Sequence, residues 1–284
     1  MKILVTGSNG QLGKEIYTIS NEFSQFTWIF LKKNDLNFLQ TDKIQTSLDF
    51  FTPNIIINCA AITDVDYCEN NNEIANKVNN LAVKELAKWS RNNKCKLFHI
   101  SSNFVYKSSP EELCEAKSAV CPINFYGTTK LNSEINCLKY NPNSIIIRTS
   151  WLYSIHGKNF FKRIMRKFKS REPIDAIYNH KSSPTYAYDL ADSIMKIIFE
   201  REWKPGIYNF CNQGSLSMYD IVLFLKKHIY SSNEINKIKI ENHSFKATRP
   251  EFSVMNTNKI QLHYNINIQN YKQGFEKCLQ LLND

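Results

Sequence analysis

A glycine-rich turn close to the N-terminus constrains the fold more than any other feature. Residues 2–6 form a short apolar, β-branched run, the turn GSNGQLG follows at 7–13, and a helical pattern extends from about residue 11 to 21. In this order, the glycines let the backbone approach a pyrophosphate closely, and the helix N-terminus stabilises its charge. The spacing is G-x-x-G-x-x-G, one residue wider than the common dinucleotide-binding fingerprint, so a purely structural turn stays the alternative.

The first half of the chain alternates strand-like and helix-like segments. Strands are expected at 2–6, 26–31, 54–59, 96–100 and 144–148, and helices at 11–21, 44–51, 72–92 and 126–140. Continuous apolar strands that alternate with helices predict a parallel sheet covered on both faces. The predicted fold class is therefore α/β, with a Rossmann-type doubly wound parallel sheet.

The second half is less regular and predicts a smaller mixed α/β substrate-binding lobe. Helices are expected at 158–169, 187–199, 217–228 and 271–282, and strands at 206–210 and 237–240. The last clear alternation of strand and helix ends near residue 150. We therefore predict a dinucleotide-binding domain over 1–150 plus about 186–205, and the lobe over about 151–185 and 206–284.

The charge balance admits three classes of partner. The chain has 36 Lys and Arg against 26 Asp and Glu, a net charge of +10, which suits nucleic acid, an anionic membrane or a small phosphorylated ligand. No apolar run approaches the ~18 residues of a membrane-spanning helix, and the N-terminus does not resemble a secretory signal. Eight single cysteines without a C-x-x-C pair favour free thiols in a reducing compartment. A cytoplasmic location without membrane insertion is expected.

Tyr126 and Lys130 form a pattern suited to proton transfer. Four residues apart on a helix, they lie on one face. An ammonium next to a phenol favours the phenolate and lowers the tyrosine pKa from its reference value of about 10. Such a tyrosine can protonate a carbonyl oxygen while a hydride reaches the carbon. Alone, Y-x-x-x-K also describes an ordinary pair on a helix surface.

Ser102 adds a third group at a position where ligands bind. It follows the predicted strand at 96–100, and in open α/β sheets ligands sit beyond the carboxyl ends of the strands. Its hydroxyl can bond both a substrate carbonyl and Tyr126, although a turn or cap serine is the alternative. The order of glycine turn, Ser102, Tyr126 and Lys130 is far more specific than any one of them.

Together these motifs resemble an extended short-chain dehydrogenase/reductase and, more narrowly, the dTDP-4-dehydrorhamnose reductase family. The likeness runs nearly end to end. The segments that carry it are 54–68, 78–79, 99–106, 122–134, 148–153, 157–160, 183–185 and 249–250. The later segments are the specific ones, because ordinary dehydrogenases of this class lack them.

The resemblance implies NADPH-dependent reduction of the 4-keto group of dTDP-4-dehydrorhamnose to dTDP-L-rhamnose, for cell-surface polysaccharide. Tyr126 would be the acid, and Lys130 would hold the nicotinamide ribose and tune Tyr126. The cofactor-binding residues expected are Gly7, Asn9, Gly10, Gln11, Leu12, Lys32, Asn37, Phe38, Cys59, Ala60, Ala61, Thr63, Asn79, Tyr126 and Lys130. The substrate-binding residues expected are Ser102, Asn103, Phe104, Trp151, Asn159 and Arg249.

Some positions depart from the family's pattern. Asn103 replaces its usual Asp and Phe104 its Tyr, both near the sugar, which leaves a different NDP-4-keto-6-deoxy sugar as an alternative substrate. Lys32 and Lys33 stand where an NAD enzyme carries an acidic residue, which favours NADP; two solvated lysines are the alternative, and NADH stays open. For Trp151, packing in the core is the alternative to a contact with the sugar.

Other readings concern metals, partners and class. Glu15 matches one glutamate of a magnesium site that the family sometimes has at a subunit contact, but the others find no match; no metal is assigned, and a homodimer is left open. The basic stretch 158–171 predicts a solvated helix face or attraction of a sugar nucleotide. Its aromatic residues, Phe160, Phe161 and Phe168, fit a buried stripe, so a nucleic-acid site is weakly supported. A non-catalytic, dinucleotide-binding regulatory subunit is the rival from another class; the retention of Ser102, Tyr126 and Lys130 argues against it.

Overall fold

A six-stranded parallel sheet forms the centre of the computed structural model, which describes residues 1–107, 113–170, 172–200 and 202–283. Its strands follow the order β10-β5-β4-β3-β1-β2. They are β1 (Lys2–Thr6), β2 (Thr27–Leu31), β3 (Ile55–Asn58), β4 (Lys96–Ser102), β5 (Ile145–Thr149) and β10 (Gly206–Asn209). The expected Rossmann-type fold class is confirmed.

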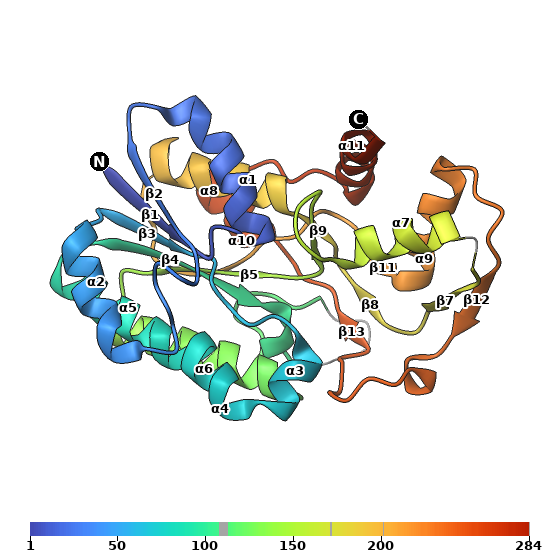
Figure 1. Ribbon diagram of the computed structural model, residues 1–284, viewed down its shortest axis with the longest axis horizontal. Helices are drawn as coiled ribbons and strands as arrows, with labels where there is room; N and C mark the ends of the chain where they lie inside the picture. The colour runs from blue at the N-terminus through green and yellow to red at the C-terminus, as the bar shows by residue number, and fades with distance from the viewer. Residues whose placement is uncertain (108–112, 171, 201, 284) are drawn as a thin grey trace.

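Helices cover both faces of this sheet (Figure 1). The helices α1 (Gln11–Ser20), α8 (Ala187–Glu200) and α10 (Asn258–Tyr264) share one core with the sheet. On the opposite face pack α2 (Ile44–Phe51), α5 (Ala82–Asn92) and α6 (Phe125–Tyr140). Successive residues of a strand point to opposite faces, so a strand covered on both sides must be apolar throughout. In β3, accordingly, Ile55 and Ile57 enter the first core and Ile56 the second.

The lobe lies at one end of the main sheet, on the side where Figure 1 places α7 and α9. Its helices are α7 (Phe160–Ser170), α9 (Met218–His228) and α11 (Tyr271–Asn283). Its short strands pair as β7 (Ile174–Ile177) with β12 (Ile235–Ile238), β6 (Leu152–Tyr153) with β9 (Thr185–Tyr186), and β8 (Lys181–Ser182) with β11 (Leu216–Ser217) and β13 (Phe252–Ser253). Tyr153, Phe161 and Phe275 pack against one another in its core.

Two details of the predicted organisation need correction. The predicted division put residues 206–209 and 258–264 in the lobe. However, β10 pairs in parallel with β5 and completes the main sheet, and α10 shares a core with that sheet. The single helix expected at 72–92 is α4 (Asn72–Asn76), a π-helical turn (Lys77–Leu81) and then α5. A short helix, α3 (Val65–Asn70), precedes them. π-turns inside helices are frequent at functional sites, and this one carries Asn79.

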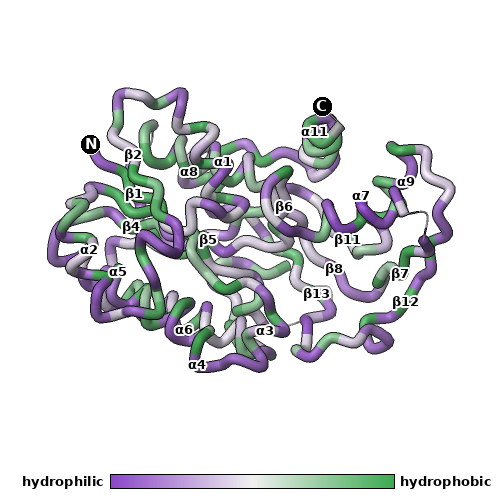
Figure 2. The backbone as a smooth tube through the Cα atoms, in the orientation of Figure 1, coloured by the Kyte–Doolittle hydropathy of each residue, from purple (hydrophilic) through white to green (hydrophobic). Residues whose placement is uncertain are grey.

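A buried ion pair ties α6 to the main sheet. Arg148 on β5 donates to both carboxylate oxygens of Glu134 on α6, at 2.9 and 2.6 Å, and the Ser101 hydroxyl donates to the same carboxylate. Both charged side chains are at most 3% exposed. The strands β1 and β5 are largely apolar in Figure 2. The pair therefore sets how α6 sits on the sheet.

Replacing Glu134 with alanine is expected to lower the free energy of unfolding by about 3–5 kcal/mol, because it leaves the buried Arg148 guanidinium without its partner. Urea denaturation followed by circular dichroism measures the change. The matched control is Glu73→Ala, which breaks an exposed pair with Lys77 and should leave the midpoint unchanged. Equal shifts in the two variants would contradict a structural role for the buried pair.

Candidate active site

A cavity of about 460 Å³ lies where the carboxyl ends of β1, β3, β4 and β5 face the lobe. This is the edge at which ligands bind in open α/β sheets. Of the predicted site residues, the cavity is lined by Gly7, Gly10, Gln11, Leu12, Cys59, Ala61, Thr63, Ser102, Asn103, Phe104, Tyr126, Lys130, Trp151 and Asn159. The structure thus brings together residues that are up to 152 positions apart (7 to 159) in the chain.

The glycine turn fits the phosphates of a dinucleotide. Gly7 has a φ of +62°, and a Cβ there would lie 2.8 Å from the backbone of Ala60. A Cβ on Gly13 would lie 2.6 Å from the carbonyl oxygen of Gly7. The N-cap of α1 is Gly10, which offers no side-chain cap, and the first turn carries no acidic residue. The free N–H groups and positive end of this helix are therefore open to an anion.

Asn79 shapes the cavity wall without lining the cavity. Its side chain accepts from the Ile62 N–H at 2.8 Å and donates to the Ile62 carbonyl at 3.0 Å and to Thr129 at 3.2 Å. The π-turn thus holds the loop after β3 against α6. The predicted contact of Asn79 with the cofactor becomes, in this geometry, support of the loop that carries Ala61 and Thr63.

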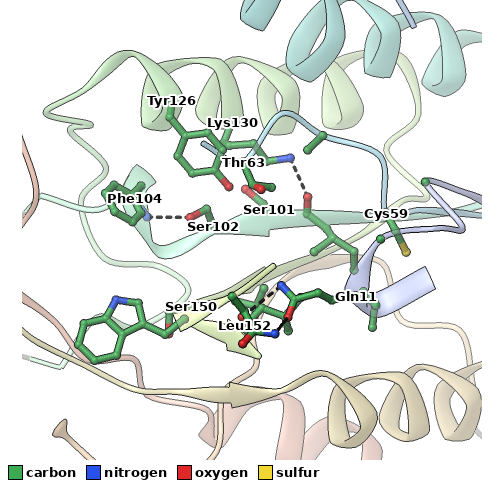
Figure 3. A pocket seen from close by; sticks show the side chains of 18 of the residues that line it. Gln11, Cys59, Thr63, Ser101, Ser102, Phe104, Tyr126, Lys130, Ser150 and Leu152 are labelled. Atoms are coloured by element: carbon green, nitrogen blue, oxygen red, sulfur yellow. Dashed lines mark hydrogen bonds between the residues drawn. The ribbon is translucent and has the colours of Figure 1, made fainter. Parts of the chain in front are cut away.

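The three predicted catalytic residues meet in this cavity (Figure 3). Tyr126 points from α6 toward Ser102 at the end of β4, and the ammonium of Lys130 is directed to the carbonyl of Ile100. The Ser102 hydroxyl accepts from the Phe104 N–H at 3.2 Å, donates to Asn103 Oδ1 at 3.3 Å and lies next to the Tyr126 phenol. Lys130 is 1% exposed, and its ammonium donates to the carbonyl of Ile100 at 2.7 Å. The trio therefore combines a phenol, a hydroxyl and a fixed ammonium at one point.

The pKa values depart from the sequence-based expectation. We expected Lys130 to lower the pKa of Tyr126, but burial raises it to about 12, against a smaller lowering by the bond to Ser102. Burial also lowers the pKa of Lys130 to about 8, opposed by Glu134. At neutral pH the phenol thus holds its proton and the lysine is mostly charged. This is the protonation state that a proton donor with a neighbouring cation requires.

Five of the six predicted substrate-binding residues line the cavity: Ser102, Asn103, Phe104, Trp151 and Asn159. Phe104 packs edge-on against Tyr126, with ring centroids 5.7 Å apart, and Trp151 lies perpendicular to His180. Asn159 caps α7 by accepting from the Lys162 N–H and donates to Gln11 at 2.8 Å. The sixth, Arg249, is not among the cavity-lining residues.

Arg249 instead holds the lobe to α3. Its guanidinium donates to the Asp66 carboxylate at 2.7 Å, and the backbone N–H groups of Lys246 and Ala247 donate to the same oxygen. The hydrogen bond from Arg249 contributes most to a pKa of about 2 for Asp66. The structure therefore gives Arg249 a contact between the two parts of the molecule.

Several predicted cofactor residues lie away from the cavity lining. Phe38 is 5% exposed and belongs to the core on the α6 face, and Asn37 accepts from the Leu39 N–H. Lys32 is exposed directly after β2, and its N–H donates to Asp35. Asn9 and Ala60 belong to the glycine turn and to the backbone that it touches.

Sequence reasoning missed part of the lining. The additional residues are Gly13, Val65, Ile100, Ser101, Thr149, Ser150, Leu152, Gly157 and Lys158. Four of them follow from one signal, since Ile100, Ser101, Thr149 and Ser150 are where β4 and β5 end side by side. Carboxyl ends of neighbouring parallel strands form one edge.

Among the described residues, no group of three or more His, Cys, Asp or Glu side chains is placed to hold a metal ion. Glu15 is 3% exposed, and burial raises its pKa while a hydrogen bond with Ser154 opposes the rise. We assign no metal to Glu15.

The described residues also include no helix long and apolar enough to cross a membrane.

The doubly wound sheet, the glycine turn and the Ser102–Tyr126–Lys130 cavity define a Rossmann-type oxidoreductase of the short-chain dehydrogenase/reductase class. The model of one family, described as RmlD substrate binding domain, matches residues 1–283. The chain therefore belongs to this family.

Individual relatives agree with this placement. A dTDP-4-dehydrorhamnose reductase of Aggregatibacter actinomycetemcomitans is 28% identical, with 97% of each chain covered. A dTDP-4-dehydrorhamnose reductase structure from Clostridium acetobutylicum is 29% identical, with a TM-score of 0.95 and all of both chains covered. Another, from Bacillus anthracis in complex with NADP, is 28% identical, with a TM-score of 0.94 and 99% of both chains covered.

Lys130 offers a test of the site through stability. Between about pH 8 and 10.5 the unfolded chain holds a proton on this lysine that the folded chain lacks, so this group makes unfolding less favourable as pH rises. Below pH 8 both states are protonated, and the folded state carries the full cost of burying the ammonium. The stability of Lys130→Met relative to the wild type should therefore be greater at pH 7 than at pH 10.5, by about 3 kcal/mol.

Urea denaturation of Lys130→Met and the wild type at pH 7 and pH 10.5 checks this expectation, since the cost of the buried charge is almost gone at the usual lysine pKa of 10.5. Lys139→Met, which removes an exposed lysine of the same helix, is the control and should change little at either pH. A stability difference between Lys130→Met and the wild type that is the same at both pH values would refute a destabilising buried ammonium.

Proposed function

We propose that this protein is an NADPH-dependent reductase that converts the 4-keto group of dTDP-4-dehydrorhamnose into the hydroxyl of dTDP-L-rhamnose, for cell-surface polysaccharide. The observation that carries the proposal is the convergence of Ser102, Tyr126 and Lys130 in the cavity that the glycine turn also lines. The names of the family's curated reductases support the same substrate. Eight free cysteines support a cytoplasmic location. A homodimer stays a prediction.

In the proposed reaction, each of the three side chains has a part in the reduction. NADPH, when bound, supplies the hydride to the carbonyl carbon. The Ser102 hydroxyl and the Tyr126 phenol orient the carbonyl oxygen by hydrogen bonds. As negative charge develops on that oxygen, Tyr126 gives it the phenolic proton, and the Lys130 ammonium stabilises the phenolate that remains. The phenolate then regains a proton from solvent, so the protein ends each turnover unchanged.

The dinucleotide would bind along the glycine turn and the loop after β3. The uncapped N-terminus of α1 would bind the diphosphate, and Lys130 would bind the nicotinamide ribose. Lys32 and Lys33 are exposed after β2, next to the turn, and no acidic side chain takes the first position after that strand. This favours a 2′-phosphate and hence NADPH over NADH. The complex of the Bacillus anthracis reductase with NADP supports this choice.

The first test follows NADPH absorbance with enzymatically generated dTDP-4-dehydrorhamnose. Tyr126→Phe should lower kcat by about 10²–10⁴-fold, since it removes the proton donor but keeps the ring. Tyr140→Phe, at the other end of α6, should leave the rate unchanged. No turnover by the wild type, or equal turnover by Tyr126→Phe, would reject the assignment. Identification of the product by NMR separates dTDP-L-rhamnose from a different deoxy sugar.

A second test concerns the choice of cofactor. Replacing Lys32 and Lys33 together with alanine should raise KM for NADPH about five- to tenfold, because exposed charge contacts contribute about 1 kcal/mol. KM for NADH should stay constant, since NADH lacks the 2′-phosphate. Lys43→Ala with Lys94→Ala, which removes two exposed lysines outside the cavity lining, is the control. Parallel loss with both dinucleotides would remove the argument from these lysines.

A further inference from the structure

Four buried side chains form a continuous hydrogen-bonded chain beneath the cavity. Thr6, Asn58 and His99 stand side by side on β1, β3 and β4, since Thr6 pairs with Asn58 and Asn58 with His99 in the sheet register. The Thr6 hydroxyl lies 2.6 Å from Asn58 Oδ1, and Asn58 Nδ2 lies 3.1 Å from His99 Nδ1. His99 Nε2 lies 2.8 Å from the hydroxyl of Ser133 on α6. Each residue is at most 1% exposed.

The donors and acceptors around His99 determine which ring nitrogen carries the proton. The Ser133 hydroxyl lies 2.6 Å from the carbonyl oxygen of Lys130, which can only accept, so this bond uses its single proton. Ser133 must therefore accept from His99, and Nε2 carries a hydrogen. At the other end, Nδ1 faces an amide donor of Asn58, so it carries none. The neutral Nε2–H tautomer satisfies every member of the chain.

The same histidine borders both ends of Lys130. Through Ser133, it holds the backbone carbonyl of Lys130. The Lys130 ammonium donates to the carbonyl of Ile100, the residue after His99. His99 Nε2 lies 3.5 Å from this ammonium, and since both are donors the contact is steric and not a hydrogen bond. The imidazole thus blocks the ammonium from turning toward the sheet.

We propose that His99, held as its neutral Nε2–H tautomer, is the positioning residue for Lys130. It fixes the turn of α6 at Ser133 and directs the lysine's remaining N–H groups into the cavity. Burial and the nearby Lys130 ammonium keep the pKa of His99 well below its usual value, so the ring stays neutral. The inference rests on the proposed function only in taking Lys130 as a cofactor-binding group.

Two variants test the chain at different links, with NADPH as the probe. Ser133→Ala and His99→Phe should each weaken NADPH binding about fivefold, the effect of one lost hydrogen bond, and lower kcat further. Binding is measured by fluorescence titration, independently of turnover. His99→Gln can keep a donor near Nε2 and should recover part of the loss. Ser144→Ala is the matched control, because its buried hydroxyl also donates to a carbonyl three residues earlier.

The tautomer has a readout of its own. Nitrogen-15 NMR should show one ring, absent in His99→Gln, with a protonated Nε2 and a bare Nδ1 across pH 5–8. A protonated Nδ1, or a ring that becomes cationic in this range, overturns the proposal. So does Ser133→Ala that folds, melts lower and binds NADPH as the wild type does. A wild type that binds NADPH without reducing the sugar nucleotide rejects the proposed function and leaves the positioning of Lys130 intact.

Discussion

The close contact of backbone at the end of β1 is the constraint on which the rest of the site depends. Gly7 touches the backbone of Ala60, and Gly13 touches Gly7, at distances that a Cβ would violate. These contacts bring the N-terminus of α1 and the loop after β3 to one point. Because β1, β3 and β4 run in register, that same point lies above Thr6, Asn58 and His99.

Register explains how a polar chain can exist inside an otherwise apolar sheet. Leu4, Ile56 and Leu97 precede Thr6, Asn58 and His99 by two positions and point to the same face, where they fill the core against α5 and α6. The next position of each strand on this face is polar instead, and each polar side chain is hydrogen-bonded to the neighbouring strand or to α6. Satisfied buried networks of this kind rigidify and specify their surroundings.

The sequence supported local features well and distant contacts poorly. The apolar runs of β1 and β3, the helix α2 and the grouping of Ser102 with Tyr126 follow from patterns within a few residues or from the edge rule for parallel sheets. The π-turn could not be foreseen, because it depends on Asn79 bonding a loop 17 residues earlier. The bond of Arg249 to Asp66 spans 183 residues, and no local pattern encodes it.

The predicted boundary of the main sheet was wrong for the same reason. The pattern that ends near residue 150 gives no sign that β10 returns to pair with β5, since the intervening lobe separates them along the chain. The strands β8 and β13 were also missed, because each is only two residues long and is defined by its pairing with the other. Periodicity detects an element when its own residues define a face, and these elements take their face from the contact.

Lys130 shows how function and stability oppose each other at this site. A lysine 1% exposed is costly to fold around, and burial alone would favour its neutral form. The carbonyl of Ile100 and the nearby Glu134 offset part of this cost. Arg148 binds the Glu134 carboxylate and so keeps it from approaching the lysine more closely. The result is an ammonium that is charged at neutral pH, close to its titration point and hydrogen-bonded to the carbonyl of Ile100. A cation held in this way can stabilise negative charge that develops in the same cavity.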